Sequence, residues 1–218
     1  MVANTKTSEV SSLEQWRVAL ENATQQPQIA TLIGEMGYDS TVIEQGKNLL
    51  TETRTLYDAN KTEDDETTEA SEAFKNARTE LSKIYTRHRK RARVVFLDEV
   101  VLLRRLALDT EVPRPYVKWL EAVKKFYAEA ADSEIQTRLA LLKITPEEIT
   151  AATDLIAVVE AARANYLREV GESQDATKIK DEAMNRMATW MSRFYSVARI
   201  ALEDNPQLLE VLGKPVKS

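Results

Sequence analysis

The chain contains no cysteine, and this absence removes several classes of site at once. Disulfides, zinc fingers, iron–sulfur clusters and thiol nucleophiles all require cysteine sulfur. Only one histidine, His88, is present among the 218 residues. A ferritin-like di-iron site takes a Glu-x-x-His pair from each of two helices, so it cannot form here. The residue types that carry most metal and nucleophile chemistry are therefore missing or single.

Glycine and proline are also scarce, with five and six copies. Long segments lack both, while Ala, Leu, Glu, Lys and Arg are abundant, and this composition favours helix. No run of about 18 apolar residues occurs, and residues 1–12 lack the apolar stretch of a signal peptide. The net charge of −5 argues against a surface built wholly for nucleic acid or anionic lipid. We therefore expect an all-α, soluble, cytoplasmic protein without a membrane partner.

A motif near the middle of the chain returns near its end. Residues 92–98, Ala-Arg-Val-Val-Phe-Leu-Asp, correspond to residues 198–204, Ala-Arg-Ile-Ala-Leu-Glu-Asp, and the step is 198 − 92 = 106 residues. Leucines at 102, 103 and 106 return at 208, 209 and 212 with the same step. Trp16 and Trp119 begin the two copies at a slightly shorter step, since 119 − 16 = 103. Self-similarity at a fixed spacing predicts an internal duplication.

The repeat and one proline-containing segment predict how the chain is divided. Pro113 and Pro115 disfavour helix in the residues before them, which indicates a linker. The expected parts, in order, are a disordered tail, a first repeat, a linker, a second repeat and a loose tail, at residues 1–11, 12–108, 109–115, 116–213 and 214–218. The expected fold is thus two tandem helical-bundle units related by duplication.

Each repeat is expected to contain a long helical hairpin together with short helices. Apolar residues spaced by threes and fours form one stripe over residues 42–57 and another over residues 70–95. The polar stretch 58–72 should contain the turn, although no Gly or Pro marks it, and one long unbroken helix is the alternative. In the second repeat, Gly171 predicts the turn. The clearest helix start is Thr145-Pro146, a cap followed by proline at the first helical position.

The repeated motif also pairs an arginine with an aspartate five residues later, as Arg93 with Asp98 and Arg199 with Asp204. Each aspartate lies where one helix should end and a short helix begin, so it is expected to cap backbone N–H groups. The arginines are expected to pair with these aspartates or with carboxylates of the hairpin. Both roles are structural.

One feature is typical of a binding site, and we call it the basic cluster. Its members are Arg87, Arg89, Lys90, Arg91, Arg93, Arg104 and Arg105. If displayed on one face, the cluster could neutralise several phosphates. However, a helix advances by about 100° per residue, which spreads neighbouring side chains around its circumference. The second copy keeps only Arg193 and Arg199. We therefore favour a solvated, internally paired helix end, with nucleic-acid or polyanion binding as the alternative.

His88 lies on an apolar stripe, and Phe194 takes its place in the second copy. A position that takes His in one copy and Phe in the other is expected to be a packing position. No nucleophile–base arrangement, Gly-x-Ser-x-Gly motif or phosphate-binding loop is visible. The sequence therefore predicts a non-enzymatic interaction or scaffold protein without a cofactor. Its partner would be an unidentified protein or a second copy of the chain.

Overall fold

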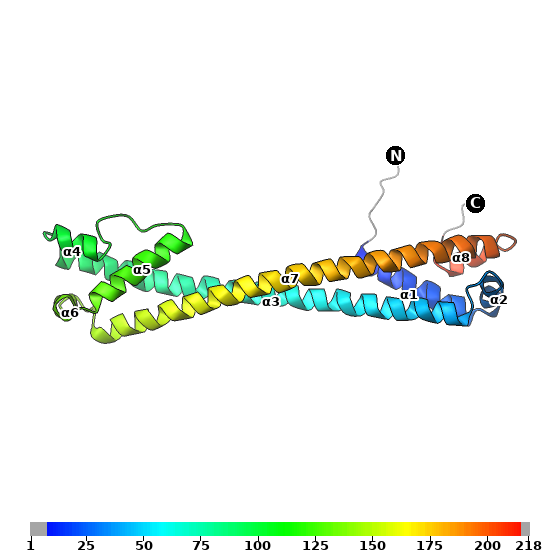
Figure 1. The fold of residues 1–218 in the computed structure, drawn as a ribbon, viewed down its shortest axis with the longest axis horizontal. Helices are drawn as coiled ribbons and strands as arrows, with labels where there is room; N and C mark the ends of the chain where they lie inside the picture. Colours follow the sequence, from blue (N-terminus) through cyan, green and yellow to red (C-terminus); the bar gives the residue numbers. More distant parts are fainter. Residues whose placement is uncertain (1–7, 215–218) are drawn as a thin grey trace, which may run out of the picture. The chain divides into compact units, whose positions relative to one another are not determined.

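A computed structural model describes residues 8–214, and the regular secondary structure within this range is entirely α-helical (Figure 1). The helices are α1 (Glu9–Gln25), α2 (Pro27–Glu35), α3 (Ser40–Val95), α4 (Val100–Arg105), α5 (Tyr116–Ala130), α6 (Ser133–Ala140), α7 (Pro146–Ala201) and α8 (Leu208–Val211). The expected all-α class is therefore confirmed. A search of the described residues finds no helix with the length and apolar character needed to cross a bilayer.

α3 and α7 are continuous helices of 56 residues each. The predictions of a turn in residues 58–72 and of a turn at Gly171 are therefore wrong. The alternative, one long unbroken helix, describes α3. Polar composition does not stop a helix when no proline interrupts it. A single glycine in a helix interior costs only about 1 kcal/mol relative to alanine, which packing can offset. The polar side chains also find partners: Asn60 Nδ2 on α3 donates to Thr177 Oγ1 on α7 at 3.0 Å.

The chain folds into two compact units, each of which combines separate parts of the sequence. Unit 1 contains Met1–Asp64 and Glu172–Ser218, and unit 2 contains Asp65–Gly171. The expected linker, residues 109–115, is non-helical but belongs to unit 2 and does not separate the units. The chain forms two cores because α3 does not turn back. A helix rises about 1.5 Å per residue, so a continuous helix of 56 residues separates the short helices before it from those after it.

Unit 1 packs α1, α2 and the first part of α3 against the second part of α7 and α8 (Figure 1). Trp16 of α1 is buried in its core with Phe194 of α7. At Gly46 the helices approach so closely that an ideal Cβ would lie 2.3 Å from Trp190 Cη2. Glycine is therefore required at this position, because it lets the indole ring lie against the backbone of α3.

Unit 2 packs the second part of α3 against α5, α6 and the first part of α7, with α4 beside them (Figure 1). Trp119 is buried here, as Trp16 is in unit 1. Tyr85 of α3 and Phe126 of α5 make an edge-to-face ring contact with centroids 5.5 Å apart. Both tryptophans that begin the sequence repeats are thus core residues.

The 106-residue step of the sequence also relates the elements. α7 starts 146 − 40 = 106 residues after α3 starts, and it ends 201 − 95 = 106 residues after α3 ends. The unit boundaries shift by nearly the same step, because 64 + 106 = 170 and 172 − 106 = 66. Burial follows the step as well: Ala92, Phe96 and Leu106 are 0% exposed, as are Ala198, Leu202 and Leu212. Residues 106 positions apart are called counterparts below.

The starts of α7 and α1 follow local capping signals. α7 begins as expected, with Glu148 N donating to Thr145 Oγ1 at 3.3 Å. α1 begins earlier than expected, because Ser8 caps it by accepting from Ser11 N at 3.2 Å. Residues 9–11 of the expected N-terminal tail are therefore helical. The rest of that tail and residues 215–218 lie outside the described residues.

The repeated aspartates are not helix caps. The N-cap of α4 is Glu99 and that of α8 is Gln207, and neither makes a side-chain capping bond. Asp98 precedes the N-cap of α4 by one residue, and Asp204 lies further still from α8. A capping side chain must stand at the N-cap itself to reach the N–H groups of the first turn. The expected capping role of Asp98 and Asp204 is therefore wrong.

Candidate functional site

Two arginines of the basic cluster hold the chain segment that follows α4. Arg93 Nε and Nη2 donate to the carbonyl oxygen of Leu108 at 2.8 and 2.6 Å, and Nη2 also donates to that of Thr110 at 3.1 Å. Arg89, which is 5% exposed, donates to the carbonyl oxygens of Ala107 and Thr110. The expected pairing of Arg93 with an acid is therefore wrong. Its guanidinium instead satisfies carbonyls of a non-helical segment, where backbone groups lack helical partners.

The other arginines of the cluster also have partners within the chain. The contacts, with the shortest N···O distance of each, are Arg87 with the Glu148 carboxylate (3.8 Å), Arg91 with the Lys143 carbonyl (3.0 Å), Arg104 with the Asp109 carboxylate (3.8 Å) and Arg105 with the Glu129 carboxylate (2.7 Å). Lys90 alone among the seven has no hydrogen bond or ion pair to any residue in the range 8–214. A polyanion would therefore have to compete with the protein's own acids and carbonyls.

His88 belongs to a buried polar chain in unit 2. The Tyr127 hydroxyl lies 3.0 Å from His88 Nδ1, and His88 Nε2 lies 3.5 Å from Glu148 Oε2. Burial raises the pKa of Tyr127, so this phenol keeps its proton at neutral pH.

The electrostatics of His88 keep it neutral at pH 7. Burial lowers its pKa below the usual 6.5, and the nearby charge of Glu148 raises it in part. The positive charges of Arg87 and Arg91 lower the pKa further. His88 is 0% exposed and Tyr127 2% exposed, so a substrate has no access to this group. The expected packing position is confirmed, and it lies in the interior of unit 2.

A third feature is an exposed group of aliphatic side chains, which we call the apolar end of unit 2. It consists of Val94, Leu97, Val100, Val101 and Leu141, which are between 65% and 79% exposed. They come from the end of α3, the turn after it, α4 and the residue after α6. Figure 1 shows that α4 and α6 both lie near this end of α3.

Arg138 of α6 joins the segments that form the apolar end. Its Nη1 donates to Glu99 Oε2 at 3.0 Å, and its Nη2 lies 3.4 Å from the carbonyl oxygen of Val95. Its guanidinium also lies over the Phe96 ring, 4.6 Å from the centroid. The residues after α6 are therefore held beside the end of α3, which places Leu141 in the same region as the exposed residues of α3 and α4.

The counterpart positions in unit 1 are mostly polar. The pairs are Val94 with Ile200, Leu97 with Glu203, Val100 with Pro206, Val101 with Gln207 and Leu141 with Glu35. At three of the five positions, the counterpart residue in unit 1 is Glu or Gln. Unit 1 therefore folds with polar residues at three of the five counterpart positions. Single exposed aliphatic residues are common on proteins, but an exposed group marks an interaction surface.

Sequence reasoning missed the apolar end. Val100, the first residue of α4, is 65% exposed. Leu97, Val101 and Leu141 carry no periodic signal that distinguishes an exposed aliphatic residue from a buried one. A position-by-position comparison of the two copies contains the signal, because Leu97 stands opposite Glu203 and Leu141 opposite Glu35.

Comparison with models of protein families, with curated proteins and with solved structures finds no match for this chain. The function is therefore argued from the geometry of the apolar end, the basic cluster and the His88 group.

Proposed function

We propose that this chain is a non-enzymatic scaffold protein that self-associates through the apolar end of unit 2. The observation that carries the proposal is the exposure of its five aliphatic side chains, each at least 65% exposed. Covering water-exposed apolar surface of this kind with a partner lowers the free energy of the system. The polar counterparts in unit 1 indicate that binding, and not folding, accounts for the aliphatic residues.

A second copy of the chain could cover the apolar residues at the centre of this surface and pair with the charged residues at its border. Lys90 lies one helical turn before Val94, and Asp98 follows Leu97 directly. Both Lys90 and Asp98 are exposed, and neither has an ion pair or hydrogen bond in the described part of the chain. In a symmetric dimer every contact occurs twice. Lys90 of one copy and Asp98 of the other would then form two ion pairs at the rim of one apolar contact.

The free energies are compatible with a weak dimer. Full burial of a Val or Leu side chain contributes about 1.5–3 kcal/mol, so ten such side chains, about two-thirds exposed, contribute roughly 10–20 kcal/mol. Loss of translational and rotational freedom on association costs about 4–15 kcal/mol. The midpoints differ by about 5 kcal/mol, which corresponds to a Kd of the order of 100 μM.

Sedimentation equilibrium of the parent and of a triple variant tests this proposal. The variant Leu97→Glu, Val101→Gln and Leu141→Glu places the residues of unit 1 at the counterpart positions of unit 2. We expect the parent's mass to rise from monomer toward dimer with concentration, while the variant stays monomeric. Ile200→Glu, which changes a 58% exposed aliphatic residue in unit 1, should associate like the parent. A parent that is monomeric at several hundred micromolar, or a triple variant that associates equally well, would refute the proposal.

We include in this proposal the internal duplication predicted from the sequence. It is supported by the shared 106-residue step of the motif, of the bounds of α3 and α7, and of the burial pattern. In this account each unit combines the first part of one repeat with the last part of the other. Divergence after duplication then left an apolar end on unit 2 alone.

Polyanion binding through the basic cluster stays the alternative. Its arginines already contact carbonyls or carboxylates, and Lys90 is its one cation without a partner among the described residues. We therefore expect any binding to nucleic acid to be weak. Tight binding whose affinity falls steeply with salt would favour the alternative over the scaffold proposal. Cytoplasmic location stays a prediction.

A further inference from the structure

A pocket of about 220 Å³ in unit 1 brings two cations beside a buried phenol. Its walls include Trp16 of α1, Met191, Tyr195 and Arg199 of α7, and Lys214, which follows α8. None of the described residues that line it is acidic. The pocket therefore combines positive charge with an aromatic and apolar wall.

Arg199 and Lys214 both line the pocket, and neither has a counter-ion among residues 8–214. Lys214 Nζ lies 4.2 Å from the centroid of the Tyr195 ring. Burial lowers the pKa of Lys214, and the positive charge of Arg199, which lines the same pocket, lowers it further. Arg199 has no hydrogen bond or ion pair to the residues that the structure describes. An anion placed between these groups would relieve their repulsion and supply an acceptor to both.

Tyr195 adds an unused donor to the wall of the pocket. Its side chain is 5% exposed, and its hydroxyl has no hydrogen-bond partner in the described structure. Burial raises the pKa of this phenol to about 12, so it keeps its proton at neutral pH. Buried hydroxyl groups are normally paired, and an unpaired one at a pocket is an observation that a ligand can explain.

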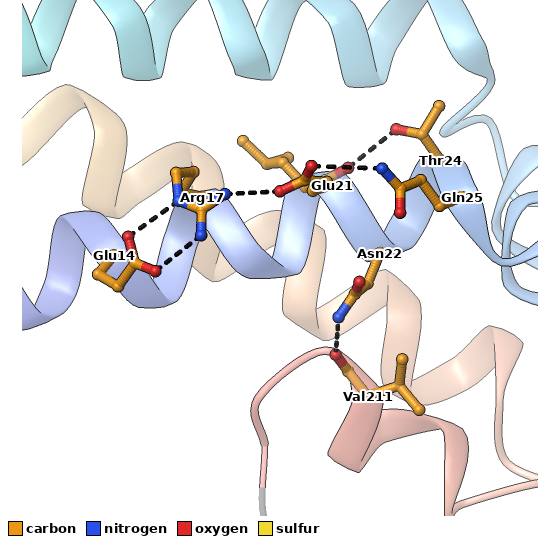
Figure 2. A network of polar contacts seen from close by, with 8 residues as sticks. Glu14, Arg17, Glu21, Asn22, Thr24, Gln25 and Val211 are labelled. Carbon is orange, nitrogen blue, oxygen red and sulfur yellow. Dashed lines mark hydrogen bonds and ion pairs between the residues drawn. The ribbon is translucent and has the colours of Figure 1, made fainter.

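The position of Lys214 is fixed by the chain around it. Its backbone N–H donates to the Leu209 carbonyl at 3.0 Å. Gln15 Nε2 donates to the Gly213 carbonyl at 2.8 Å. Figure 2 shows Asn22 of α1 pointing to the carbonyl of Val211, a contact of 2.7 Å. The bonds of Gln15 and Asn22 hold the end of α8 and the residues after it against α1, so the backbone at Lys214 is positioned by the chain itself.

The same place in unit 2 is used differently. Arg93, the counterpart of Arg199, donates to the carbonyl oxygen of Leu108, the counterpart of Lys214. Arg89, the counterpart of Tyr195, also donates to carbonyls of this segment. In unit 2 the chain itself therefore provides the acceptors. The fold does not dictate a cationic pocket, and its presence in unit 1 is a property of that unit.

We propose that this pocket binds a small organic anion, with a phosphate or carboxylate group between Arg199 and Lys214 and a planar or apolar part against Trp16 and Met191. The anionic group supplies the acceptors that the chain provides in unit 2. The apolar part explains why the site lies against the Trp16 ring and not on an open surface. The proposal is independent of the apolar end, which belongs to unit 2.

NMR titration of the full chain with phenyl phosphate, benzoate and inorganic phosphate tests the site. We expect phenyl phosphate to shift the Trp16 indole N–H signal saturably, while that of Trp119 in unit 2 stays unchanged. Comparison of the three probes distinguishes a phosphate from a carboxylate ligand and measures the part played by the ring. If the two cations hold the anion, Arg199→Gln and Lys214→Gln should each weaken binding about tenfold or more.

Arg193→Gln is the matched control, because Arg193 is an exposed arginine of α7 outside this pocket. It should bind like the parent, and so should the triple variant of the apolar end, which separates the two proposals. Lys214→Gln changes a partly exposed residue near the end of the described chain, so it should fold like the parent. The site is refuted if no probe gives a saturable shift at Trp16, or if Arg199→Gln and Lys214→Gln bind as Arg193→Gln does.

Discussion

Arg93 and Arg199 are counterparts, 106 positions apart in the sequence, and their surroundings differ. Arg93 donates three hydrogen bonds to the carbonyls of Leu108 and Thr110. Arg199 has no such bond to the described residues and instead lines a pocket. Equivalent positions therefore supply a structural clamp in unit 2 and a candidate ligand site in unit 1.

This difference predicts unequal effects of truncation. Arg93→Ala should lower the free energy of unfolding by about 1–3 kcal/mol, because it leaves carbonyls of the segment after α4 without their charged donor. Arg199→Ala should change it by less than about 0.5 kcal/mol, as for an ordinary surface residue. Urea denaturation of both variants measures the two values. Equal losses would mean that Arg199 makes stabilising contacts comparable to those of Arg93.

His88 predicts how stability depends on pH. Burial holds its folded-state pKa below 6.5, whereas the unfolded chain has the ordinary value. The unfolded state therefore binds a proton that the folded state excludes, and stability falls as the pH drops below about 6.5 toward the folded-state pKa. Above pH 6.5 the residue is neutral in both states and adds no slope.

His88→Phe, which installs the counterpart residue Phe194, tests this pH dependence. We expect the free energy of unfolding of the variant to change less between pH 7 and pH 5 than that of the parent. The comparison of slopes is informative even if loss of the Tyr127 hydrogen bond lowers stability at every pH. Parallel slopes for parent and variant would show that His88 does not titrate differently on folding.

The sequence predicted the buried positions of single residues better than their polar partners. His88 was expected at a packing position, and it is buried. Periodicity carries this information because it reports which face of a helix is apolar. Partners of Arg93 and Asp98 depend on the path of non-helical segments, which periodicity does not describe. The expected Arg–Asp pairing failed for that reason.

At the scale of elements, the long helices α3 and α7 each contribute one part to unit 1 and one part to unit 2. The helix start at Thr145-Pro146 was predicted correctly, because a capping threonine and a proline act locally. The turns in residues 58–72 and at Gly171 were not found. Polar residues were interpreted as a turn, yet they are equally suited to the solvated faces of a continuous helix.

Gly171 gives a direct test of the unbroken helix. A Cβ at Gly171 would meet no atom within 4 Å, and its φ is not in the positive range. Gly171→Ala should therefore stabilise the protein by about 0.5–1 kcal/mol through helix propensity. Thermal or urea denaturation measures the change. Destabilisation would indicate a turn that needs glycine at this position.

Two other glycines serve as controls for that substitution. Gly37 follows α2 with φ +86°, where alanine is strained, so Gly37→Ala should destabilise. Gly46 lies against the Trp190 ring, so Gly46→Ala should cost about 1–3 kcal/mol through overpacking. The expected order of stability is thus Gly171→Ala above the parent and the two controls below it.

At the scale of the whole molecule, the repeat in the sequence and the compact units are different divisions of the chain. Unit 1 takes α1 and α2 from the first expected repeat, residues 12–108, and α8 from the second, residues 116–213. Sequence periodicity identified counterpart positions but not which segments share a core. That choice depends on whether α3 and α7 turn back, and no local signal decided it. The apolar end became visible only when exposure and the counterpart residues were compared.

The measurement that tests the central claim most directly is crosslinking through a single introduced cysteine. The chain has no cysteine of its own, so Leu97→Cys places one thiol at the apolar end of unit 2. Its control, Glu203→Cys, places one thiol at the exposed counterpart position in unit 1. If copies associate through the apolar end, a bifunctional thiol reagent should convert Leu97→Cys to covalent dimers and leave Glu203→Cys monomeric. Equal crosslinking of both variants, or none of either, would contradict the account.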